Sequence, residues 1–198
     1  KLELTPHILF LLGLRDNYGQ HYDGAVAAWE KGAKVAGEGD ANSEIRAMNF
    51  YWAGVANNNM GQYPAATICF TSAKQALRMT TAQVFEIRRI EMETSFFQNW
   101  AKEDVVGRIA KDLEKLVKDI ENAGGEDLSR SLNKTRTTLG NVLLGGHVQH
   151  ANSKPNWLSD ALHWFDQVVN SSTERSIWAE FGRAQALWAA GNTAAATI

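Results

Sequence analysis

The sequence has little of the features on which several common protein classes depend. Its 198 residues include one cysteine, Cys69, so an intrachain disulfide framework is excluded and a reducing compartment is expected. The net charge is only −2, which leaves no global field to attract nucleic acid. The longest apolar run near the start, residues 8–12, is too short to cross a bilayer. We therefore expect a cytoplasmic protein that neither binds nucleic acid nor inserts into a membrane.

Proline is also scarce, and the remaining composition is that of an ordinary globular protein. Each of the three prolines, Pro6, Pro64 and Pro155, can be placed in the first turn of a helix, where the missing N–H costs little. Hydrophobic residues make up 44% of the chain, which is too apolar for disorder. The chain begins at Lys1 and its last residues read as the start of a helix, so we expect a piece of a longer protein.

Two segments of the chain repeat each other at identical intervals. In each, a glycine is followed by a tyrosine nine residues on, then by an alanine, an aromatic residue and a second small residue. The first copy has Leu9, Leu12, Gly13, Tyr22, Ala25, Trp29 and Gly32, and the second has Phe50, Ala53, Gly54, Tyr63, Ala66, Phe70 and Ala73. We expect Ala25 and Ala66 to meet Gly13 and Gly54, so that the two helices of each hairpin approach closely, while the aromatic residues fill the space towards the next hairpin.

This pattern of small and large residues resembles the tetratricopeptide repeat. The copies are 41 residues apart, from Ala25 to Ala66, which is longer than the roughly 34 residues of a standard repeat and resembles the long-repeat subclass. The resemblance implies an all-α fold, a right-handed α-solenoid of antiparallel helical hairpins with about four to five repeats. It implies a single domain over residues 1–198, with hairpins at about 5–38, 42–79, 81–123, 127–170 and 172–198.

Local signals place the later hairpins. Thr80 and Gln83 fit a capping box at the start of a helix, and a strongly amphipathic helix over residues 105–120 is followed by two glycines that end it. The fourth hairpin has about nine extra residues, which we place in a polar loop at 147–155. Ser171 and Glu174 fit another capping box, which would open the fifth hairpin.

The resemblance also implies a binding groove, because the first helix of each hairpin lines the concave side in this family. Carried over by register, the groove residues are Asn17, Tyr18, Met48, Tyr51, Trp52, Asn58, Asn59 and Arg88. Amides suit the backbone of an extended peptide and rings suit its apolar side chains. The alternative is that Tyr51 and Trp52 only pack between repeats. A clamp for a terminal carboxylate is disfavoured, since Phe10, Leu14 and Trp52 occupy several positions that it needs.

Catalytic and metal-binding patterns are weak. His147 and His150 are three residues apart, a spacing that can share a metal, but no cysteine or glutamate pair accompanies them, which favours a solvated loop. Cys69 precedes the core aromatic residue Phe70, where a buried and inert thiol is expected. We therefore expect no catalytic residues, no metal and no cofactor.

The function that these observations favour is a scaffold or adaptor module that binds a protein or peptide in its groove. The alternative is a ligand-sensing regulatory domain of a larger signalling or transcriptional regulator. The last repeat lacks a following hairpin to cover Ala184, Leu187 and Trp188, so homodimerisation through this end is a further expectation.

Overall fold

The computed structural model describes residues 4–76, 80–125, 128–171 and 176–192, and every regular element among them is helical. The first elements are α1 (Pro6–Tyr18), α2 (Tyr22–Ala36), the short 3₁₀ helix η1 (Asp40–Asn42), α3 (Ser43–Asn59) and α4 (Tyr63–Ala76). They are followed by α5 (Thr81–Asn99), α6 (Glu103–Ala123), α7 (Ser129–His150), α8 (Asn156–Ser171) and α9 (Ile177–Ala189). The all-α prediction is confirmed. None of the described helices is both long and apolar enough to cross a membrane.

The chain divides into two compact units, Lys1–Ile87 and Arg88–Ile198. The boundary falls within α5, so most of that helix belongs to the second unit. Each unit has its own helix packing and is described separately. The prediction of one domain over the whole chain stays a prediction.

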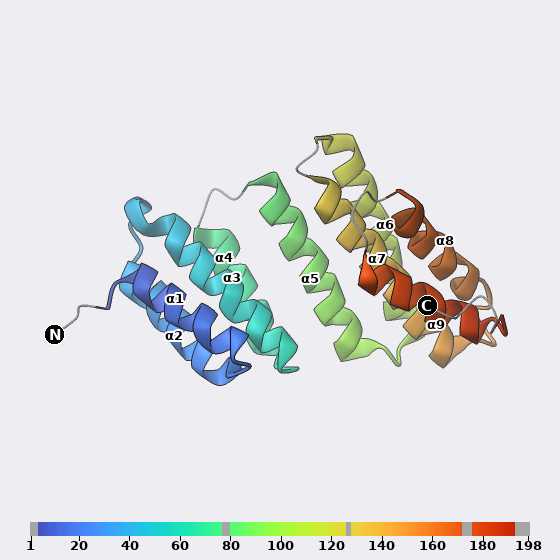
Figure 1. Ribbon diagram of the computed structural model, residues 1–198, viewed down its shortest axis with the longest axis horizontal. Helices are drawn as coiled ribbons and strands as arrows, with labels where there is room; N and C mark the ends of the chain where they lie inside the picture. The colour runs from blue at the N-terminus through green and yellow to red at the C-terminus, as the bar shows by residue number, and fades with distance from the viewer. Residues whose placement is uncertain (1–3, 77–79, 126–127, 172–175, 193–198) are drawn as a thin grey trace. The chain divides into compact units, whose positions relative to one another are not determined.

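In the first unit, consecutive helices pack side by side, α1 on α2, α2 on α3 and α3 on α4 (Figure 1). The wholly buried ring of Trp29 fills the space in which a side chain at Gly13 would lie. Its Nε1 donates a hydrogen bond to the Phe10 carbonyl at 3.1 Å. Phe70 occupies the corresponding space beside Gly54. The spacing of small and aromatic residues therefore does bring neighbouring helices together, with rings rather than the alanines set against the glycines.

The turns that join the helices of these hairpins also repeat. Gln20 and Gly61, 41 residues apart, both have positive φ values, 60° and 73°. At each turn the chain makes the same hydrogen bonds, from Gln20 N to Asn17 O in one copy and from Gly61 N to Asn58 O in the other, both at 3.0 Å. Two stretches with different residues thus adopt one backbone conformation, which is independent support for the repeat.

The second unit repeats the packing order of the first. Helices α7, α8 and α9 are in contact consecutively, and α7 also touches α9, as α1 touches α3 in the first unit. Phe165 of α8 is wholly buried against both Gly140 of α7 and Gly182 of α9. Helix α9 is followed by a turn at Gly191, where φ is 78° and the N–H donates to Trp188 O at 3.0 Å, as in the earlier turns.

Several predictions from local sequence signals are confirmed, and the predicted loop at residues 147–155 is wrong in part. The capping box opens α5, with Thr80 N donating to Gln83 Oε1 at 2.9 Å and Gln83 N to Thr80 Oγ1 at 3.3 Å. Helix α6 ends at Gly124, whose φ is 64°. Residues 147–150 are not a loop but the last turn of α7, because part of the insertion lengthens that helix. The second predicted capping box, at residues 171–174, reaches outside the described residues.

Candidate functional site: a groove across α5, α7 and α9

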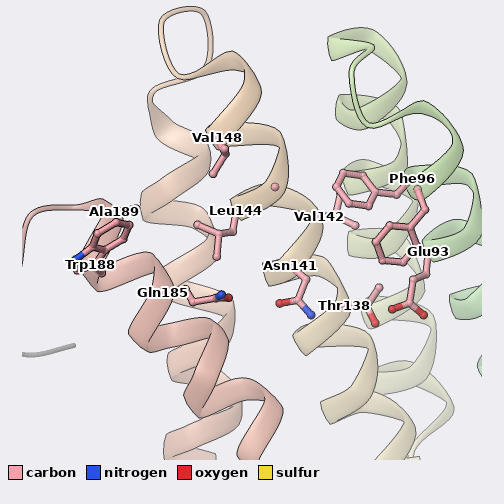
Figure 2. Close-up of a pocket in the computed structure, with 12 residues that line it drawn as sticks. Glu93, Phe96, Thr138, Asn141, Val142, Leu144, Val148, Gln185, Trp188 and Ala189 are labelled. Carbon is pink, nitrogen blue, oxygen red and sulfur yellow. The ribbon is translucent and has the colours of Figure 1, made fainter. Parts of the chain in front are cut away.

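A groove of about 480 Å³ lies within the second unit, between three helices that each begin a predicted hairpin. Figure 2 shows its residues extending from Trp188 on α9, across α7, to Phe96 on α5. The lining comprises Glu93, Phe96, Phe97, Thr138, Asn141, Val142, Leu144, Gly145, Val148, Gln185, Trp188 and Ala189.

The floor of the groove is apolar and close-packed. Phe96, Val142 and Leu144 are buried, and Val142 is only 1% exposed. Gly145 lets the Phe96 ring lie against α7, because a Cβ at that position would be 2.8 Å from Phe96 Cζ. A floor held in this way offers a preformed surface to apolar groups.

The rim of the groove exposes large apolar side chains to water. Trp188 is 70% exposed and Val148 is 65% exposed, and Phe97 lies beside Phe96 with ring centroids 5.6 Å apart. Burying such surface is favourable by about 25 cal/mol per Å². A clustered apolar rim around a hollow is therefore typical of a binding surface.

The charge within the groove is internally compensated. Glu93 is the one ionisable side chain among the described lining residues, and its carboxylate accepts a hydrogen bond from Arg89 Nη1 at 3.0 Å. Arg89 Nη1 also donates to Thr138 Oγ1 at 3.0 Å, which ties α5 to α7 beneath the groove. Because Arg89 balances the charge of Glu93, the groove lining favours contact with neutral, apolar groups over binding of an acidic or phosphorylated partner.

Two amide side chains complete the lining. Asn141 of α7 and Gln185 of α9 are both exposed and make no hydrogen bond to the described residues. Gly182 allows Asn141 to lean on α9, because a Cβ at Gly182 would be 3.2 Å from Asn141 Oδ1. Figure 2 shows the two amides on neighbouring helices.

The lining positions follow the register of the repeat. Gly140 lies 86 residues after Gly54, and a phenylalanine ring fills the space beside each. Gly191 lies 130 residues after Gly61, and each ends its helix in the same turn. Adding 86 residues to Val55, Asn58 and Asn59 of α3 gives Asn141, Leu144 and Gly145 of α7. Adding 130 residues to the same three positions gives Gln185, Trp188 and Ala189 of α9. All six of the latter residues line the groove.

The predicted groove residues lie mostly in the first unit. Tyr18 at the end of α1 and Asn59 at the end of α3 are exposed, while Asn17, Met48 and Asn58 are half-buried. The Oδ1 atom of Asn17 is buried and has no hydrogen-bond partner among the described residues. Whether these side chains bind a partner stays a prediction.

The predicted aromatic groove residues have packing contacts. Tyr51 and Trp52 meet edge to face with centroids 5.6 Å apart, and Trp52 lies 6.0 Å from the core ring of Trp29. Both rings therefore contribute to the packing of the first unit. Arg88 belongs to the second unit, where its Nη2 donates to Asp119 Oδ2 at 3.0 Å and joins α5 to α6.

The residues considered for metal binding or nucleophilic chemistry lie elsewhere. His147 and His150 are on the last turn of α7, and His150 meets the Trp157 ring edge to face. Among the described residues, no three histidine, cysteine or acidic side chains gather as metal ligands would. Burial, and then the charge of Glu30, raise the pKa of Cys69, which lowers its thiolate fraction at neutral pH.

Sequence reasoning missed most of this groove. Val148 lies in the stretch for which the sequence predicts a polar loop, and the sequence indicates Trp188 only as part of the uncovered end of the stack. The register from Asn58 is the signal that finds Leu144 and Trp188, but it does not reach Val148, which matches Gln62 beyond the end of α3. Comparison with protein-family models and with curated proteins found no match to this chain.

Proposed function

We propose that this chain is a non-catalytic module that binds a peptide or a peptide-like segment of another protein in the groove across α5, α7 and α9. We further propose that its hairpins form a right-handed α-solenoid of the tetratricopeptide type. The repeated contacts of Trp29, Phe70 and Phe165 with helix glycines support this arrangement.

The observation that carries the binding proposal is an apolar hollow with an exposed rim on α5, α7 and α9, the first helices of three predicted hairpins. Trp188 and Val148 remain mostly in water although they flank a buried floor. A ligand that inserts apolar side chains would cover both, and aromatic residues at the centre of an interface contribute strongly to affinity. The lining offers hydrophobic contact and hydrogen bonds, which supports binding rather than catalysis.

The test is selection from a random peptide library displayed on phage, with the full chain as the target. Trp188→Ala removes the rim, and Trp178→Ala is its matched control, because Trp178 is also on α9 and 77% exposed but does not line the groove. We expect selected peptides to lose about tenfold or more in affinity for Trp188→Ala and to bind Trp178→Ala as they bind wild type. Failure to enrich any peptide, or equal losses in the two variants, would contradict the proposal.

A further inference from the structure

We infer that one face of α9 binds the same face of a second copy of this chain, with the two helices antiparallel. The face consists of four residues whose spacing places them on one side of the helix, Ile177, Phe181, Ala184 and Trp188. The exposed fractions of Ile177, Phe181 and Trp188 are 71%, 49% and 70%. The residues that α9 buries lie on its opposite side. A helix that is apolar on both sides is typical of a helix covered on both sides.

The matching face of α3 in the first unit is covered by a helix. Tyr51 lies 130 residues before Phe181, and its ring packs against Phe70 of α4 with centroids 6.2 Å apart. Gly54 lies 130 residues before Ala184 and is buried beneath the same ring of Phe70, whereas Ala184 is only half-buried. Helix α4 follows α3 after a short turn and packs against it, so the two run antiparallel. A second α9 in the same orientation would cover α9 as α4 covers α3.

The sequence of this face suits pairing with itself. A twofold axis midway between Phe181 and Ala184 sets Phe181 of each copy opposite Ala184 of the other. Ile177 and Trp188 are equally distant from the same midpoint, so they also face each other across the pair. A ring then meets a small residue on both sides of the axis, which is how helices pack in both units.

Charge does not oppose this pairing. The four residues of the face are uncharged, and the charged residues of α9 are Glu180 and Arg183. Arg183 Nε donates to Asp166 Oδ1, and Glu180 also interacts with another residue of the chain. Two identical faces of this kind meet without the like-charge contacts that keep copies of a protein apart.

The exposed area of the face sets the strength of the association. A large aromatic side chain has about 150–250 Å² to bury, so covering the exposed parts of Ile177, Phe181 and Trp188 removes roughly 400 Å² of each copy from water. This is about half of what each partner buries in a standard interface. We therefore expect a reversible dimer with a dissociation constant of about 10–100 µM.

Trp188 belongs both to this face and to the rim of the groove. Pairing therefore covers part of the rim, and a ligand that holds Trp188 in the groove favours the monomer. The other three residues of the face do not line the groove, so the pairing can be tested independently of the proposed function.

Sedimentation velocity of the full chain tests the pairing, with circular dichroism to verify the helix content of each variant. For wild type we expect the dimer fraction to rise with concentration up to about 300 µM. Ile177→Glu should weaken association about tenfold or more, because pairing would bury its carboxylate against apolar side chains. Ile68→Glu is the matched control, since Ile68 lies on α4 and is 67% exposed, and it should associate like wild type.

A charge swap tests the antiparallel register. Trp188→Lys should weaken association as Ile177→Glu does, because each variant alone sets a charge against an apolar side chain. In an equimolar mixture, the new carboxylate of one chain faces the new ammonium group of the other, while the second Ile177 and Trp188 pair is unchanged. The mixed dimer should therefore form about tenfold more tightly than either variant pairs with itself.

Three results would overturn the inference. They are a wild-type chain that stays monomeric at about 300 µM, equal weakening by Ile177→Glu and Ile68→Glu, and a mixture of the charge-swap variants that associates no better than each variant alone. The first two would exclude this face of α9 as the site of self-association, and the third would exclude its antiparallel pairing.

Discussion

The ring of Phe165 fills the space that a side chain at Gly140 would need, with Phe165 Cε1 only 2.6 Å from the position of a Cβ at Gly140. The same edge of the ring also lies against Gly182 of α9, where a Cβ would be 2.5 Å from both Phe165 Cε1 and Phe165 Cζ. Because Phe165 is enclosed between two helices, it has no room to move away from an added methyl group. This contact holds α7, α8 and α9 together, and with them one wall of the groove.

Gly140→Ala should therefore destabilise the protein although alanine is the better helix former. We expect the free energy of unfolding to fall by about 1–2 kcal/mol, since overpacking costs more than the gain in helix propensity. Gly107→Ala is the matched control, as a Cβ there would be 3.6 Å from the nearest atom of Trp157, an ordinary contact. That variant should be neutral or more stable by up to about 1 kcal/mol. Urea unfolding followed by circular dichroism measures both, and equal effects would contradict the packing described for Phe165.

Trp29 should tolerate replacement by phenylalanine better than by alanine, because phenylalanine is the residue at the matching position of the next repeat, Phe70. Trp29→Phe loses the hydrogen bond to Phe10 and part of the ring, so we expect a loss of about 1–2 kcal/mol in unfolding free energy. Trp29→Ala leaves a cavity and should cost about 3–5 kcal/mol. Trp178→Phe is the exposed control and should change stability by less than about 0.5 kcal/mol. Comparable losses for the two substitutions of Trp29 would be inconsistent with a ring-filled site.

The pKa of Glu103 should fall below its ordinary value, because its carboxylate accepts a hydrogen bond from Ser153 Oγ at 2.6 Å and lies 3.5 Å from Lys154 Nζ. A folded-state pKa below the unfolded one means that the charged carboxylate favours the native loop near neutral pH. This contribution is lost as the pH falls through the folded-state pKa. Ser153→Ala should raise the Glu103 pKa towards 4.5, because it removes the hydrogen bond that lowers this pKa most.

Titration of the Glu103 side-chain carbon by nuclear magnetic resonance measures these shifts. Glu103→Gln should remove this part of the acid dependence of stability without changing the helices. An unchanged pKa in Ser153→Ala would show that the loop at 151–155 is not held to α6 in this way.

The parts of the fold that were predictable are those decided by neighbouring residues or by a strict interval. The capping box of Thr80 and Gln83 and the end of α6 at Gly124 both follow from such signals. The groove was less predictable because its residues lie on three helices that are distant in sequence. The insertion obscures the repeat spacing in α7. Because about nine extra residues follow Gly140, the sequence predicts a polar loop at Val148 rather than a helical turn facing α9.

The aromatic residues show why single positions are hard to assign from sequence. Trp52 and Trp188 are both tryptophans on the first helix of a predicted hairpin, yet one contacts the core ring of Trp29 and the other is largely in water. Only the neighbours of each side chain decide between packing and binding. Those neighbours lie on other helices, and the number of residues that separates them from the tryptophan differs between the two units.

The most direct test of the groove is to map where a selected peptide touches the full chain, using methyl signals in nuclear magnetic resonance spectra. Leu144 and Val148 line the groove, whereas Val35 and Ile68 are exposed on α2 and α4. We predict that titration with the peptide shifts the signals of Leu144 and Val148 and leaves those of Val35 and Ile68 unchanged. Shifts confined to Val35 and Ile68, or spread equally over all four, would contradict binding in the groove.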